Sequence, residues 1–68
     1  MTAESFRATL EALGLIPARA ARMLGVPSST IWRWHSGKRA IPAPVARFLS
    51  FLVAADVTPE EVHKLLDD

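Results

Sequence analysis

The sequence contains no cysteine and has two histidines, His35 and His63, which are far apart. Disulfides and thiolate metal sites are therefore excluded, and two distant histidines make a poor set of metal ligands. The most apolar run, from Phe48 to Ala55, is too short to cross a bilayer. We expect a chain that has no metal site, does not enter a membrane, and is held together by packing or by a partner.

Net charge is also low, because eight lysines and arginines stand against seven acidic residues and leave a formal charge of +1. Any basic surface for a nucleic acid would have to be local. Arg33, Lys38 and Arg39 do lie close together in the sequence, whereas five acidic residues gather in the segment 56–68. The N-terminal segment 1–13 lacks the charged-then-apolar order of a signal peptide. We therefore expect a soluble, cytoplasmic protein.

Residue constellations typical of enzymes are missing as well. There is no glycine-rich phosphate loop, no pair of carboxylates in an apolar setting and no cluster of ligands. Ser36 follows His35 directly, but consecutive residues of a helix point in different directions, so they do not form a nucleophile and its base. The expectation is a non-enzymatic protein with no cofactor and no small-molecule substrate.

Half of the residues are hydrophobic, and a chain of this length has room for one core. Residues 1–68 are therefore expected to form a single domain. Thr2 can cap a first helix in which Phe6 and Leu10 recur at helical spacing, and Gly14 marks its end. There is no strand signal and no internal repeat, so the predicted fold class is all-α, with five helices.

A second helix is predicted from Pro17 to Leu24 and a third from about Ser28 to His35. Gly25 suits the tight turn between them because that turn needs a positive φ, and Ser36-Gly37 ends the third helix. Helical periodicity then separates an inward face from an outward face. The inward residues are Ala21, Leu24, Val26, Ile31 and Trp34, and the outward residues are Ser28, Ser29, Trp32 and Arg33.

Other side chains of the first three helices are predicted to face solvent. Arg7 and Glu11 lie four residues apart, the spacing of a weak surface ion pair. Arg19 and Arg22 project from the second helix, where a solvated face and a contact with phosphate are both open. Trp32 should also be exposed, because its side of the third helix offers no place to bury a large ring.

The fourth helix is predicted from Ala43 or Pro44 to Ala54. Phe51 and Val53 lie off its main apolar stripe, so the helix needs a second burial surface, for which the candidates are the fifth helix and another copy of the protein. The main stripe consists of Val45, Phe48, Leu49, Leu52 and Ala55.

The fifth helix has the clearest local start in the chain. Thr58-Pro59-Glu60-Glu61 combines an N-cap residue, proline at the first helical position and the acidic partner of a capping box. Val62, Leu65 and Leu66 form its apolar stripe. His63 and Lys64 are predicted to face solvent.

The stretch from Pro17 to Arg39 resembles the helix-turn-helix DNA-binding domains of the lambda repressor and Cro-like (XRE-type) family. The resemblance rests on the spacing of the small residue Ala21, then Gly25-Val26, Ser29-Thr30-Ile31, Trp34 and Ser36-Gly37-Lys38-Arg39. It implies a five-helix lambda-repressor-like domain with the helix-turn-helix at about 17–36 and a third helix that lies in the major groove.

The same resemblance assigns roles to individual positions. Residues that would reach base edges are Ser28, Ser29, Trp32 and Arg33. Pro17 would lie beside the sugar-phosphate backbone, and Lys38 and Arg39 should touch phosphate after the third helix. For Arg19 and Arg22, phosphate contact remains one of two alternatives.

This chain departs from the family pattern where relatives hold phosphate. Relatives commonly have glutamine at the position of Pro17 and a hydroxyl residue at the position of Pro27. Proline has no side-chain group that can make their hydrogen bonds. Ile41 and Ala43 stand where relatives often carry further basic residues. Phosphate contacts supply most non-specific affinity, so binding to DNA is expected to be weaker, or a partner or dimer supplies the rest.

The sequence is compatible with two alternative functions of different classes. The first is sequence-specific binding of double-stranded DNA by a small transcriptional regulator, a repressor of the phage or prophage type. The second is a protein-interaction module on a helix-turn-helix scaffold, which would use Trp32 and the apolar fourth helix. Salt-dependent binding to duplexes would separate them.

Overall fold

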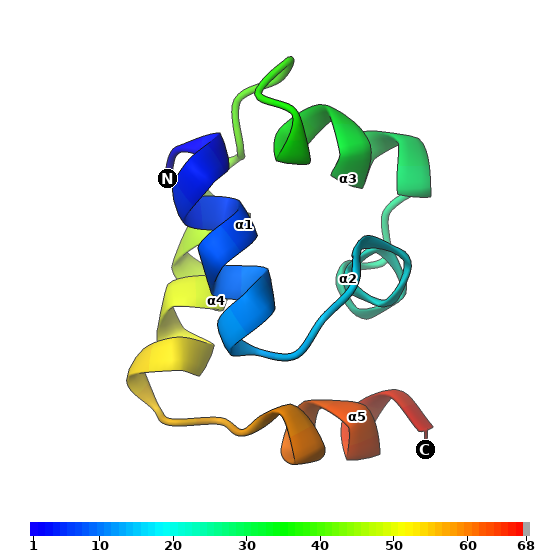
Figure 1. The fold of residues 1–68 in the computed structure, drawn as a ribbon, viewed down its shortest axis with the longest axis vertical. Helices are drawn as coiled ribbons and strands as arrows, with labels where there is room; N and C mark the ends of the chain where they lie inside the picture. Colours follow the sequence, from blue (N-terminus) through cyan, green and yellow to red (C-terminus); the bar gives the residue numbers. More distant parts are fainter. Residues whose placement is uncertain (68) are drawn as a thin grey trace.

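The computed structural model describes residues 1–67. These residues form helices joined by short connections, and none of them belongs to a strand, which confirms the all-α prediction (Figure 1). The helices are α1 (Ala3–Ala12), α2 (Pro17–Leu24), α3 (Ser28–His35), α4 (Ala43–Ala54) and α5 (Pro59–Asp67). No helix within residues 1–67 combines the length and the apolar character that a membrane span requires.

The predicted starts of the first and last helices are confirmed, because side chains make the expected cap contacts there. The Thr2 hydroxyl accepts a hydrogen bond from the Ser5 backbone N–H at 3.0 Å. At α5, the Thr58 N–H donates to Glu61 Oε1 at 3.1 Å, and the Glu61 N–H donates back to Thr58 Oγ1 at 3.2 Å. This capping box satisfies two N–H groups that a helix start leaves without partners.

Glycine is required at two connections. Gly25 ends α2 with φ +69°, as predicted, in the left-handed region that side chains with a Cβ disfavour. Gly14 has φ +67°, and a Cβ on it would lie 2.6 Å from Cβ of Pro59. The first turn of α5 therefore packs directly against the end of α1, and only glycine leaves room for it.

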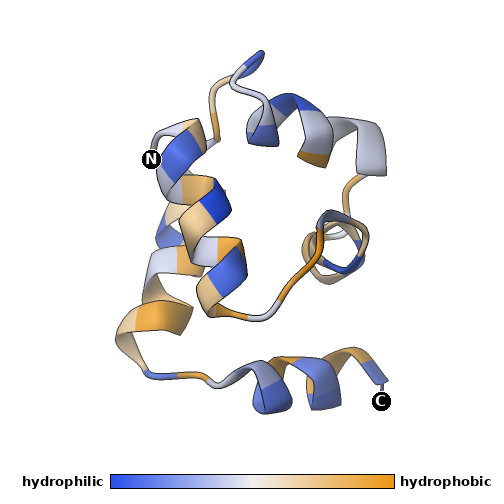
Figure 2. Ribbon diagram, in the orientation of Figure 1, coloured by the Kyte–Doolittle hydropathy of each residue, from blue (hydrophilic) through white to orange (hydrophobic). Residues whose placement is uncertain are grey.

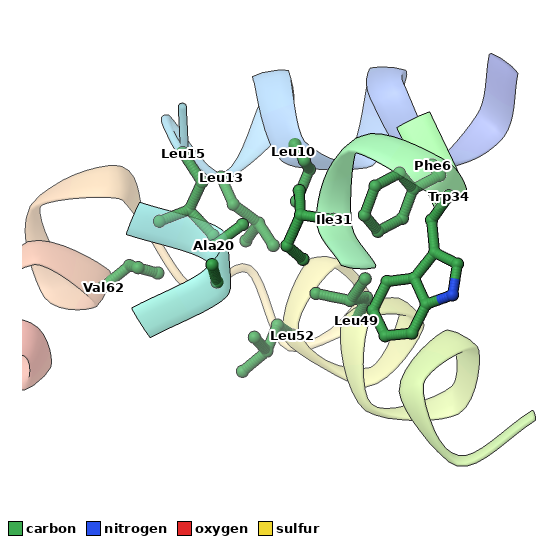
Figure 3. Packing of buried hydrophobic residues seen from close by; sticks show 11 residues of the cluster. Phe6, Leu10, Leu13, Leu15, Ala20, Ile31, Trp34, Leu49, Leu52 and Val62 are labelled. Atoms are coloured by element: carbon green, nitrogen blue, oxygen red, sulfur yellow. The ribbon is translucent and has the colours of Figure 1, made fainter. Parts of the chain in front are cut away.

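The core contains most of the inward residues that periodicity predicted for the first three helices, whereas Leu24 and Val26 are half-buried and pack against it. Phe6 and Trp34 meet edge to face with ring centroids 6.0 Å apart, which confirms Trp34 as a core residue. Figure 3 shows these two rings at one end of the cluster and Val62 of α5 at the other. The buried hydrophobic residues are Phe6, Leu10, Leu13, Leu15, Ala20, Ala21, Ile31, Trp34, Leu49, Leu52 and Val62.

Four predictions about the faces of α4 and α5 are wrong. Phe48, Ala55 and Leu65, predicted to lie on apolar stripes, are exposed, Phe48 to 43% and Leu65 to 68%. Each helix meets the rest of the small domain along a narrow strip, so the edges of its stripe stay uncovered. His63, predicted to face solvent, is half-buried instead, and its Nε2–H donates to the Gly14 carbonyl at 3.1 Å.

Candidate functional site

The outer face of α3 carries the side chains that the sequence placed there. Ser28, Ser29, Trp32 and Arg33 are all exposed, whereas Ile31 and Trp34 on the opposite side are buried. Trp32 is 55% exposed, which confirms the prediction that its ring stays outside the core. The helix lies at one end of the molecule and α5 at the other (Figure 1). The face is therefore open to a large ligand.

A hydrogen bond from α1 fixes the end of α3. Arg7 Nη1 donates to the carbonyl of His35 at 2.6 Å, where the last turn of the helix leaves its carbonyls without internal partners. Arg7 and Glu11 are both exposed, as predicted, but the one ion pair within residues 1–67 joins Arg19 to Asp67 and not Arg7 to Glu11. Arg7 thus acts as a brace that holds the outer face of α3 in position.

Trp32, Arg33, Ser36 and Lys38 line a hollow of about 250 Å³ on this face. The indole of Trp32 meets the imidazole of His35 edge-on, with centroids 5.2 Å apart and planes at 67°. This contact restricts how the exposed ring can turn. One wall of the hollow is therefore aromatic and two others are cationic.

The backbone after α3 is folded back onto the helix end. The Arg33 carbonyl accepts hydrogen bonds from the N–H groups of Lys38 at 2.9 Å and Arg39 at 3.2 Å, and Gly37 permits the turn with φ +80°. Lys38 and Arg39 are exposed, and neither forms an ion pair within the part of the chain described. Together with Arg33 they give this end of the protein three positive charges that form no ion pair within residues 1–67.

The other two predicted phosphate contacts lie elsewhere. Arg22 Nη2 donates to the Leu66 carbonyl at 2.8 Å, and Arg19 Nη2 lies 3.7 Å from Asp67 Oδ1, so both arginines hold the last turn of α5. Arg19 is also half-buried. The prediction that both side chains project outward is confirmed for Arg22, which is exposed, and is wrong for Arg19. Positive groups are favoured at the C-terminal end of a helix, where the carbonyls carry partial negative charge.

The remaining predicted phosphate position, Pro17, has few polar groups around it. Pro17 is half-buried at the start of α2, and neither α2 nor α3 has a side-chain cap, because Ile16 and Pro27 precede them. Anchoring of phosphate by a Pro17 side chain is excluded chemically, as the sequence indicated. The start of α2 therefore offers only backbone N–H groups, whereas the start of α3 also carries the hydroxyls of Ser28 and Ser29.

Apolar side chains are exposed on α4, as predicted. Phe51 is 65% and Val53 is 42% exposed, and the C-terminal end of α4 is coloured hydrophobic in Figure 2. The surface of α3 in the same view is white to blue, except for one orange segment. The protein thus presents two different surfaces, one cationic and aromatic around α3, and one apolar on α4.

Comparisons with protein-family models, with curated proteins and with solved structures gave no match to this chain. Any functional assignment therefore depends on the two surfaces themselves. The α3 surface is the one with directional hydrogen-bonding groups and a fixed geometry, and it is the candidate functional site.

Proposed function

We propose that the protein binds double-stranded DNA in a sequence-specific manner by placing α3 in the major groove. It would act in the cytoplasm as a small transcriptional regulator, a repressor of the phage or prophage type. In this proposal the chain is a five-helix lambda-repressor-like domain, and residues 17–36 form its helix-turn-helix. The observation that carries the proposal is the separation of faces on α3, with Ile31 and Trp34 buried and Trp32 and Arg33 exposed.

The dimensions and the attachment of α3 support this reading. A helix with its side chains is about 10–12 Å across and the major groove of B-DNA is about 12 Å wide. Buried Ala20 and Ala21 bring α2 close to α3, and Arg7 braces the far end of α3. A helix held at both ends can present its side chains to base edges without a large loss of conformational freedom.

Each exposed group has a task that matches its chemistry. Arg33 can donate two parallel hydrogen bonds to O6 and N7 of guanine. The hydroxyls of Ser28 and Ser29 can pair with donors or acceptors, and Lys38 and Arg39 can neutralise phosphates beside the groove. Arg19 and Arg22 are left out of the interface because they hold α5.

Phosphate contacts are few in this proposal, so affinity should be modest for one copy of the chain. Two copies would double the number of contacts and would match a site with two half-sites. Phe51 and Val53 are the proposed contact residues of such a homodimer, since both are exposed and apolar.

A protein-interaction module is the second candidate. The observation that favours it is the exposed aromatic pair Trp32 and Phe51, at 55% and 65%, on a chain of low net charge. Such a module would bind its partner with little dependence on salt, whereas neutralising phosphates makes duplex binding fall steeply with salt.

Selection from a library of random duplexes at low and at moderate salt tests the proposal. Recovery of a preferred sequence, bound more weakly as salt rises, is the expected result. A recovered palindrome would also identify a symmetric dimer. Failure to retain any duplex at either salt concentration would contradict DNA binding and favour the second candidate, and equal retention of all duplexes would contradict sequence specificity.

A further inference from the structure

We infer that the Trp32 and Arg33 hollow reads the C5-methyl group of a pyrimidine that neighbours a guanine. This inference rests on the proposed function, because it names the feature of duplex DNA that the α3 surface recognises. The methyl group belongs to thymine in ordinary DNA and to 5-methylcytosine in modified DNA. Both bases place it in the major groove, at the same position of the ring.

The α3 surface lacks the side chains that read adenine and cytosine by hydrogen bonds. The chain contains neither asparagine nor glutamine, and α3 has no acidic residue. A pair of hydrogen bonds to adenine requires a carboxamide side chain. A carboxylate is the usual acceptor of the hydrogen bond from the cytosine amino group. Serine hydroxyls pair with either kind of group. The strong readout left to α3 is therefore guanine through Arg33 and apolar contact through Trp32.

Trp32 and Arg33 share one hollow. Trp32 forms its aromatic wall, and Arg33 lines the same space of about 250 Å³ with Ser36 and Lys38. Successive bases of a strand are about 3.4 Å apart along the helix axis. In this proposal, a methyl group against the indole and a guanine under the guanidinium belong to neighbouring bases, because both side chains line the same hollow.

The Trp32 ring is held in one orientation by its neighbour on α3. The imidazole of His35 lies edge-on to the indole of Trp32, with ring centroids 5.2 Å apart, so the indole has a preferred orientation and does not rotate freely. Its single polar atom is a donor, and most of its exposed area is apolar. Covering part of this area with a methyl group removes apolar surface from water, which favours the methylated base.

The test uses the duplex recovered by selection, with one pyrimidine exchanged at a time. Uracil in place of thymine removes the methyl group and keeps the pairing with adenine. Replacing 5-methylcytosine by cytosine, each paired with guanine, removes the same methyl group from a second base. We expect the methylated member of each matched pair, next to a guanine, to bind about fourfold more tightly, the factor that corresponds to burial of one methyl group. Fluorescence anisotropy measures the four dissociation constants.

Variants separate this inference from other causes. Trp32→Ser should reduce both ratios to about one, and Trp32→Leu should retain most of the effect because leucine is also apolar. Leu65→Ser is the matched control, since Leu65 is equally apolar and 68% exposed on α5, and it should leave the ratios unchanged.

The outcomes are distinct. Specific binding with ratios of one in the wild-type protein, or ratios that persist in Trp32→Ser, would overturn the inference and leave the proposed function intact. Failure to retain any duplex would overturn the proposed function and the inference together.

Discussion

Replacement of each tryptophan of α3 in turn should reduce stability by very different amounts. The two residues lie two positions apart in one helix, yet Trp34 is 4% and Trp32 is 55% exposed. Trp34 also meets Phe6 edge to face in the core. Removal of a buried tryptophan side chain costs about 3–5 kcal/mol, because it loses burial and leaves a cavity.

That cost is large for this chain. A domain of 68 residues has a free energy of unfolding of about 3–10 kcal/mol, at about 0.05–0.15 kcal/mol per residue. Trp34→Ala is therefore expected to unfold much of the protein, and Trp34→Phe is the milder variant that should still fold with a lower midpoint. Trp32→Ala loses the edge contact with His35, worth about 0.5–1.5 kcal/mol at most for a half-exposed pair.

Urea unfolding followed by circular dichroism at the helical signal measures both variants without relying on tryptophan fluorescence. Fluorescence then gives a second readout, because Trp34→Phe leaves the exposed ring and Trp32→Phe leaves the buried one. Acrylamide should quench the first strongly and the second weakly. Equal loss of stability in Trp32→Ala and Trp34→Ala would refute the assignment of the two faces.

Three further predictions concern the turns, the cations and the apolar face of α4. Gly14→Ala should destabilise the protein by about 2–4 kcal/mol, because it adds a clash with α5 to an unfavourable φ. Gly25→Ala should cost about 1–2 kcal/mol through its φ alone. Thermal unfolding compares the two variants, and equal losses of stability would contradict the close approach at Gly14. Replacing Lys38 and Arg39 by alanine should weaken binding to all duplexes and flatten the plot of log K against log salt by about 0.9 for each lost contact; an unchanged slope would remove both from the interface. Phe51→Glu should shift the protein from dimer to monomer in sedimentation, and a wild-type protein that stays monomeric at high micromolar concentration would rule the dimer out.

Local signals in the sequence predicted the helices because the groups that end each helix are neighbours in the chain. Thr58 and Glu61 are three residues apart, and their reciprocal hydrogen bonds form as the pattern indicates. The positive φ of Gly25 was predictable for the same reason. The alternation of Ile31 and Trp34 with Trp32 and Arg33 then gave the two faces of α3 correctly.

Contacts between distant residues could not be predicted in this way. Arg7 pairs with a carbonyl 28 residues away and Arg22 with one 44 residues away, so each depends on how the helices pack. Periodicity gives the direction of an apolar stripe but not how much of it a neighbour covers. This is why Leu65 was expected inside and is exposed.

The central claim is that the outer face of α3 contacts bases, and Arg33→Ala compared with Arg47→Ala tests it most directly. Both changes remove one positive charge from an exposed helical arginine, on α3 and on α4 respectively. On the selected duplex, Arg33→Ala should weaken binding by about 5- to 150-fold, equivalent to about 1–3 kcal/mol, and should relax the preference at one base pair. Arg47→Ala should leave that preference unchanged. Equal effects of the two variants on affinity, with the base preference intact in both, would contradict readout by α3.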